Sequence, residues 1–377
     1  MKRLFCFTVT TLLAISCVVR AQNNSSKPLT GNDDNLIQIA ILLDASNSMD
    51  GLIDQAKSQL WKIVNEFALA KRDGKTPRLE VAFFEYGKST LPSLSGYIRQ
   101  IVPLSTDLDK ISDELFKLTT NGGDEYCGRV IDDATEELTW NPSNRVMKAI
   151  FIAGNEEFTQ GNVDYRKACK NAITKGISIN TIFCGNASEG IATKWKDGAD
   201  LADGAYMSID QNQVIVDIKA PQDSLIAALG SKLNETYIGY GSAGVKRKSM
   251  QAEQDMNAMS KSRSVMVQRS VAKVSKSYSN AEWDLVDAKK ENKLDLSKVN
   301  AEELPAEMQS MAPAERESFV TAKAKERDKL QTQISKLNEE RRKYVAAQQK
   351  TSGDNTLDKA IISTVRKHAS AKGYIFK

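Results

Sequence analysis

The chain is predicted to be an α/β protein, a mostly parallel sheet wrapped by helices, followed by a mainly α-helical C-terminal region. Two observations support this prediction. Up to about residue 210, short apolar runs alternate with amphipathic helical patterns, which is typical of βαβ units wound around one sheet. Beyond Pro221 the sequence has long stretches with few strand formers and little Gly or Pro, which indicates helices.

Composition places the chain among ordinary soluble globular proteins. It has 377 residues, 41% of them hydrophobic and 27% charged, so a core can be buried and the length predicts about two domains. The net charge of +4 is too small to indicate nucleic-acid binding. The basic clusters at Lys246–Lys248 and Arg341–Lys343 are expected to be solvated helix faces.

The N-terminus resembles an export signal. Residues 1–21 have a basic start, an apolar stretch and a small-x-small end at Ala21, so we expect cleavage there and a periplasmic or secreted protein. A loose lipoprotein box ending at Cys17 is the alternative, in which that residue would be lipidated. Residues 22–34 are polar and expected to be flexible, and no later stretch has the character of a membrane span.

The alternating region predicts six strands separated by helices. Only about eleven residues connect the second and third strands, which leaves no room for a helix, so we expect one antiparallel pair there. The expected strands are Leu36–Leu43, Leu79–Tyr86, Ile98–Leu104, Ala149–Ala153, Ile177–Phe183 and Ala205–Ile209. The expected helices are Leu52–Ala70, Leu108–Leu118, Val130–Leu138, Tyr165–Lys175 and Ala192–Leu201.

The chain is therefore expected to divide into an α/β domain at 35–210, a connecting segment with a helix at 211–244, and a helical region at 245–377. Within the last region, Leu330, Ile334 and Leu337 have the spacing of a heptad seam. Such a seam could form a coiled coil and support self-association, or it could pack inside the molecule. The sequence leaves both open.

The end of the first strand carries the most informative motif. The apolar run stops at Asp44, and Ser46 and Ser48 follow at alternating positions. The carboxyl edge of a parallel sheet is where ligands of open α/β sheets bind. One carboxylate and two hydroxyls are hard oxygen donors, suited to Mg²⁺ first and also to Mn²⁺ or Ca²⁺. The alternative is a helix start with an Asp N-cap and incidental serines.

This Asp-x-Ser-x-Ser motif after a first apolar strand resembles the von Willebrand factor A (VWA) family, at its metal-ion-dependent adhesion site (MIDAS). The stretch from Trp195 to Tyr206 also resembles the last helix, glycine turn and edge strand of that family. The resemblance covers about residues 35–210. It implies a Rossmann-like sheet with one antiparallel strand, and a divalent cation held by three loops at one edge.

The resemblance identifies candidates in the other two loops. After the Gly-Gly of the second loop, Asp124 stands where the family has a Thr or an acid, and Glu125 is next in line. In the third loop Gly154 replaces the usual Asp, so an oxygen would have to come from Asn155 or Glu156. The metal ligands are thus expected to be Asp44, Ser46, Ser48, Asp124 and Glu156.

Three cysteines remain after the predicted cleavage, at positions 127, 169 and 184, and their spacing fits no zinc site. The strand assignments place Cys127 and Cys184 at the same edge of the sheet. We therefore expect a disulfide between them in an oxidising compartment, with Cys169 as a buried thiol.

The motifs of common enzymes are missing from the sequence. The only histidine is His368, and there is no phosphate-binding loop and no Gly-x-Ser-x-Gly. The sequence therefore predicts an exported, non-enzymatic binding protein that uses a bound cation to capture an acidic group of a protein or envelope ligand. The alternative is a structural or assembly protein of the cell envelope, acting through its C-terminal helices and keeping only a vestigial metal site.

Overall fold

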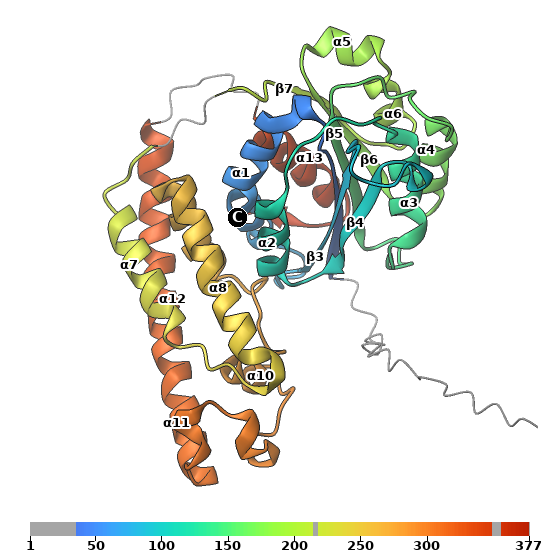
Figure 1. Ribbon diagram of the computed structural model, residues 1–377. Coiled ribbons are helices and arrows are strands. Elements are labelled where there is room, and N and C mark those ends of the chain that lie inside the picture. Colours follow the sequence, from blue (N-terminus) through green and yellow to red (C-terminus); the bar gives the residue numbers. More distant parts are fainter. Residues whose placement is uncertain (1–34, 214–217, 349–355, 377) are drawn as a thin grey trace, which may run out of the picture. The chain divides into compact units, whose positions relative to one another are not determined.

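Six strands form one sheet in the order β4-β3-β1-β5-β6-β7 in the computed structural model (Figure 1), which describes residues 35–213, 218–348 and 356–376. The predicted signal segment 1–21 and the segment 22–34 lie outside the described residues. Neighbouring strands are parallel except β3 and β4, which form the predicted antiparallel pair. The strands are β1 (Leu36–Asp44), β3 (Arg78–Tyr86), β4 (Ile98–Ser105), β5 (Met147–Gly154), β6 (Ser178–Cys184) and β7 (Tyr206–Ile209).

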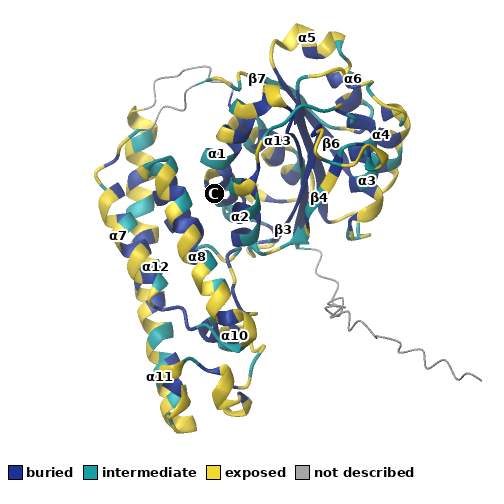
Figure 2. Ribbon diagram, viewed as in Figure 1, coloured by how far each residue is buried: buried dark blue, intermediate teal, exposed yellow. Residues whose placement is uncertain are grey.

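Both faces of the sheet are buried, which confirms the predicted α/β class. Along β1, Ile39 and Leu43 pack into one core while Ala40 and Leu42 pack into the other. Strands buried on both faces are nearly continuous apolar runs, which is why the sequence predicts them well. The first face is covered by α1 (Asp50–Ala68), α2 (Leu108–Lys117) and α13 (Leu357–Ala371), and the second by α3 (Cys127–Glu137), α4 (Tyr165–Thr174) and α6 (Trp195–Asp200) (Figure 2).

After β7 the chain forms a series of helices, most of which share the core of the first face, while the residues around α10 and α11 form a separate small core with the start of α12. Leu330 and Ile334 of the predicted seam are buried in that core, with Leu337 packed against it. The seam thus packs inside the molecule. Among the described residues, no helix is long and apolar enough to cross a membrane. The helices are α7 (Asp223–Asn234), α8 (Gly241–Lys261), α9 (Arg263–Ala272), α10 (Leu285–Lys290), α11 (Ala306–Gln309) and α12 (Pro313–Gln348).

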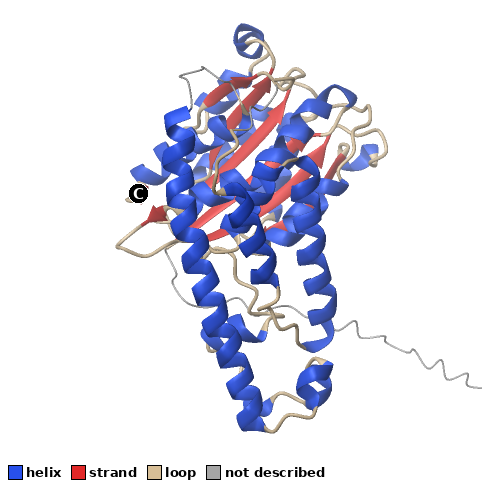
Figure 3. Cartoon of the chain, turned by 90° about the vertical axis from the view of Figure 1, so that its left-hand side faces the viewer, coloured by secondary structure: helices blue, strands red, loops and turns tan. Residues whose placement is uncertain are grey.

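The last residues return to the α/β domain (Figure 3). Helix α13 packs on α1, and the short strand β8 (Ile375–Phe376) pairs antiparallel with β2 (Ala70–Lys71). Residues 223–348 are therefore an excursion between β7 and α13. This differs from the expectation that all of 245–377 forms a helical region of its own, because the α/β domain takes its last covering helix from the end of the chain.

Candidate metal site

The loop that follows β1, residues 44–49, brings its three predicted ligands together; we call it the metal loop. The Asp44 side chain is fully buried, and its Oδ1 accepts a hydrogen bond from the Ser46 backbone N–H at 2.8 Å. The Ser46 and Ser48 hydroxyls are 3.1 Å apart. A 3-10 turn at Asn47–Met49 then leads into α1. The loop thus gathers one carboxylate and two hydroxyls in one small space.

The second loop contributes Glu125 to this group. The Glu125 side chain is buried and lies close enough to Ser46 and Asp44 for both residues to shift its pKa. Asp124, the residue expected from the sequence, is exposed, and its Oδ2 accepts a hydrogen bond from Tyr126 Oη at 3.1 Å. Among the acidic residues of this loop, Glu125 is therefore the one that the fold brings to the metal loop.

The third loop contributes Asn155. Its Oδ1 accepts a hydrogen bond from the Ser48 hydroxyl at 3.2 Å. Glu156 is exposed, but its charge raises the pKa of both Asp44 and Glu125, so it lies near the group. Both residues considered from the sequence therefore belong to the surroundings of the metal loop.

The glycine that replaces the usual aspartate in this loop is explained by Tyr86. A Cβ at Gly154 would lie 2.6 Å from Tyr86 Oη, which is closer than real contacts allow, and 3.1 Å from Asp44 Oδ2, which is a tight contact. Tyr86 Oη is held there by donating a hydrogen bond to the Ala153 carbonyl at 3.0 Å. A tyrosine inside an apolar strand carries no sign of this role in its sequence pattern.

The loops are held to one another by backbone hydrogen bonds. Ala45 N–H donates to the Tyr86 carbonyl at 2.8 Å, and Asn121 N–H donates to the Ala45 carbonyl at 2.9 Å. Gly87 has a φ of +82°, and a Cβ there would lie 2.8 Å from Asp44 Oδ1. Only glycine suits this position, because it accepts the left-handed backbone and leaves room for the carboxylate.

Burial and crowding make the carboxyls of this group easy to protonate. Burial raises the pKa of Asp44 to about 7 against the lowering effect of the Ser46 hydrogen bonds, and the charge of Glu156 adds to the rise. Burial likewise raises the pKa of Glu125 to about 7, with the charges of Asp44 and Glu156 as further causes. A nearby cation would reverse this effect, because it favours the ionised form of each carboxyl.

The residues present fit a small divalent cation. Asp44 Oδ2 is buried and accepts no hydrogen bond from the described residues, although buried carboxylate oxygens normally have partners. Among those residues, no three His, Cys, Asp or Glu side chains gather as a metal-binding group by themselves. The donor set is instead mixed: carboxylates with serine hydroxyls. Such an all-oxygen set suits Mg²⁺ or Mn²⁺.

The predicted disulfide is not formed, because the sheet lies between its two cysteines. Cys127 on α3 packs in the core of one face, and Cys184 at the end of β6 packs in the core of the other. Cys127 Sγ lies 3.9 Å from Tyr86 Oη instead. All three described cysteines are buried thiols, including Cys169 as expected. A shared edge was thus too coarse a criterion, because residues at one edge can point to opposite faces.

One protein family matches the α/β part of the chain. The family model of the von Willebrand factor type A domain matches residues 38–194. Among solved structures, BatB from Bacteroides thetaiotaomicron is 18% identical, with 46% of this chain and 90% of that chain covered and a TM-score of 0.36. Proximal thread matrix protein 1 from the mussel byssus, described with a zinc-occupied MIDAS motif, is 16% identical over 48% of this chain and 43% of its own, with a TM-score of 0.36. A search of curated proteins gave no match.

Proposed function

Because residues 38–194 form a von Willebrand factor type A domain, we propose that this protein is a non-enzymatic, cation-dependent binding protein. Its ligand would be an acidic group of a protein, captured at the edge of the sheet where the metal loop lies. The observation that carries the proposal is the buried Asp44 carboxylate, whose Oδ2 has no hydrogen-bond partner among the described residues and which lies beside two serine hydroxyls.

Each residue of the group has a distinct part in this proposal. Ser46 and Ser48 would bind the cation through their hydroxyls, and Asp44 and Glu125 would supply the negative charge that keeps it in place. Asn155 holds the Ser48 hydroxyl by accepting its hydrogen bond. When bound, the cation would offer an open coordination position to a carboxylate of the partner protein.

Metal titrations on matched variants test the proposal. By calorimetry at neutral pH, we expect the wild-type protein to bind Mg²⁺ or Mn²⁺ with a Kd on the order of 10⁻⁴ M, which is weak because the third loop lacks its carboxylate ligand. Asp44→Ala should remove this binding. Asp164→Ala is the matched control, because Asp164 caps α4 through a hydrogen bond to the Arg166 N–H and takes no part in the site.

Two outcomes would contradict the proposal. Equal titrations of the wild type and Asp44→Ala would mean that the metal site is vestigial, which favours the structural or assembly role. Catalytic turnover that disappears with Asp44→Ala would instead mean that the protein is an enzyme.

A further inference from the structure

We propose that Gln211 is a positioning residue for the metal loop, acting from the segment that leads out of the α/β domain. This inference rests on the proposed function, since it concerns the same site. Gln211 lies just after β7, about 160 residues from the metal loop in sequence, and no regular secondary structure holds it in place.

The Gln211 side chain hydrogen-bonds to both sides of the junction between the metal loop and α1. Its Nε2 donates to the Ser48 carbonyl at 2.9 Å, and its Oε1 accepts from the Leu52 N–H at 3.3 Å. One amide group therefore spans the 3-10 turn and the first turn of the helix. It satisfies a loop carbonyl and a helix N–H that lack partners within the helix itself.

Backbone packing holds Gln211 close to this junction. A Cβ at Gly51 would lie 2.5 Å from the Gln211 carbonyl oxygen, so the two segments touch directly only because residue 51 is glycine. One turn further along α1, the buried Gln55 donates through Nε2 to the Asp210 carbonyl at 2.8 Å. The segment 210–211 is thus attached to α1 at two successive points.

Attachment of the loop has a direct consequence for metal binding. The start of the metal loop is fixed by β1, which ends at Asp44, but the position of Ser48 depends on where the turn after it is held. A ligand set that is already in place binds more tightly than one that must be ordered on binding. Gln211 is therefore expected to raise the metal affinity without touching the ion.

The same contacts link the site to the helical excursion. Gln55 Oε1 accepts a hydrogen bond from the Leu357 N–H at 3.1 Å, so this residue contacts the chain both where it leaves for the helices and where it returns. The junction of the metal loop and the two crossing points of residues 223–348 thus meet on one side of α1.

Two variants at position 211 test the inference, and a neighbouring one controls for it. Gln211→Ala removes both hydrogen bonds, while Gln211→Glu keeps the acceptor for Leu52 and loses the donor to Ser48. Asn212→Ala is the control, because the exposed Asn212 side chain lies beside Gly51 as Gln211 does but makes no hydrogen bond to the metal loop or α1 within the described part of the chain. Gly51→Ala should reproduce the effect by pushing residue 211 away, although alanine is the better helix former.

The first measurement is the Mn²⁺ affinity by electron paramagnetic resonance, at a temperature where circular dichroism shows every variant fully folded. We expect Gln211→Ala to raise the Kd for Mn²⁺ about fivefold, the factor that corresponds to about 1 kcal/mol for lost hydrogen bonds. Gln211→Glu and Gly51→Ala should also raise it, and Asn212→Ala should not. A wild-type affinity in Gln211→Ala would overturn the inference.

The second measurement separates this inference from the proposed function. Amide hydrogen exchange of residues 48–52, measured in chelator, should be faster in Gln211→Ala than in Asn212→Ala. If the wild-type protein binds no Mn²⁺ but this exchange difference is found, the proposed function fails and the attachment of the loop stands. If the exchange is the same in both variants, the attachment itself is wrong.

Discussion

Single residues decide how much negative charge the metal loop faces. Asp44 and Glu125 are both buried, and burial, together with their mutual repulsion, raises the pKa of Glu125 and disfavours its ionised form. Like charges this close persist in a folded protein when a cation compensates them or when they take up a proton. The arrangement of these two carboxyls therefore bears directly on metal binding.

The neighbouring acids of the second loop give a matched pair for testing this. We expect Glu125→Gln to weaken Mn²⁺ binding about tenfold, because it removes a charged donor near the ion. Asp124→Asn should leave the affinity unchanged, since Asp124 is exposed and bonded to Tyr126. Calorimetry on both variants checks the expectation, and the reverse order would restore Asp124 as the ligand of this loop.

The contact between Gly154 and Tyr86 gives a second prediction. Gly154→Ala should destabilise the protein by about 2 kcal/mol, because the new Cβ overlaps the Tyr86 hydroxyl. Tyr86→Phe should cost about 1 kcal/mol by leaving the Ala153 carbonyl without its donor. In the double variant the alanine has room, so the two costs should not add. Additive losses in urea unfolding would show that the overlap is not the cause.

The metal loop can be predicted from the sequence, but the residues that complete the site cannot, and the reason is physical. Asp44, Ser46 and Ser48 follow a strand whose apolar run fixes their position at the edge of the sheet. Asp124 and Glu125 follow two glycines, and the pattern of residues does not say which of two adjacent side chains turns inward. Gln211 acts through a contact between segments that are distant in sequence, and a local sequence pattern cannot predict such a contact.

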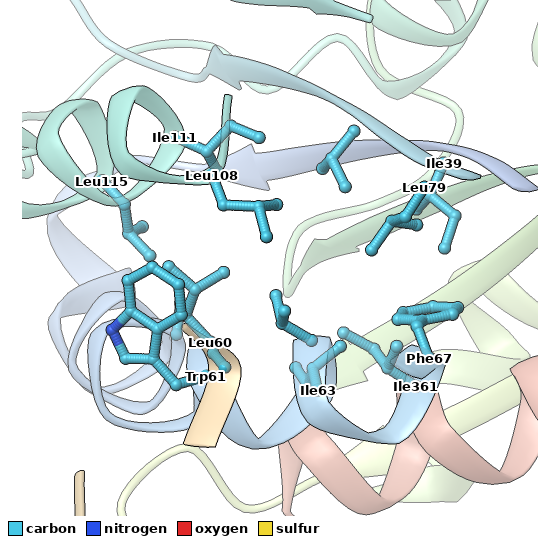
Figure 4. Packing of buried hydrophobic residues seen from close by; sticks show 14 of the residues in the cluster. Ile39, Leu60, Trp61, Ile63, Phe67, Leu79, Leu108, Ile111, Leu115 and Ile361 are labelled. Atoms are coloured by element: carbon cyan, nitrogen blue, oxygen red, sulfur yellow. The ribbon is translucent and has the colours of Figure 1, made fainter. Parts of the chain in front are cut away.

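At the scale of elements, α13 shows what a helical pattern can and cannot predict. Its apolar positions require that one face be buried, since isolated helices are marginal in water. The pattern does not indicate which surface covers the apolar face of this helix. In the structure Leu357 and Ile361 face the sheet and α1, as Figure 4 shows for Ile361 beside Ile63 and Phe67.

Two isoleucines near the end of the chain test the role of α13. Ile361 is 3% exposed and borders a small cavity of about 30 Å³ between the sheet and the helices, whereas Ile375 is 55% exposed. We expect Ile361→Ala to lower the free energy of unfolding by about 3 kcal/mol, because it enlarges a cavity in the core. Ile375→Ala should change it by less than about 1 kcal/mol. Equal losses in urea unfolding would mean that α13 is not packed as described.

At the scale of the whole molecule, a buried ionic group joins the helical excursion to the α/β domain. Arg269 on α9 is fully buried and pairs with Asp109 on α2 at 2.5 Å and with Asp255 on α8 at 2.9 Å. Its guanidinium also lies 4.3 Å from the ring centre of Trp61 on α1. One side chain of α9 thus contacts three other helices, which come from both parts of the chain.

Removing this arginine should affect both parts together. We expect Arg269→Ala to destabilise the protein by about 3 to 5 kcal/mol, because the buried Asp109 would lose its ion-pair partner and the buried Asp255 would keep only Lys273. Arg129→Ala is the control: its pair with Asp133 is partly exposed on one helix and is expected to contribute less than about 1 kcal/mol. Similar losses for both variants would mean that the buried group does not hold the two parts together.

The shared core and this ionic group together predict how the chain unfolds. The described residues belong to one compact unit, and the core of the first sheet face continues from β1 through α1 into α7, α9 and α12. Opening either part would expose apolar surface of the other, so we expect a single cooperative transition in urea. Trp195 lies in the core of the second sheet face and reports on the α/β domain, whereas Trp283 reports on the excursion. Variants that keep only one of these two tryptophans as a fluorophore should therefore give coincident curves. Two separated transitions would support the expectation from sequence that residues 245–377 are an independent unit.

The two outcomes also predict different behaviour when residues 245–377 are removed. If unfolding has two transitions, the truncated protein should stay soluble. If it has one, the truncated protein should aggregate, because the truncation also removes α13 from the sheet.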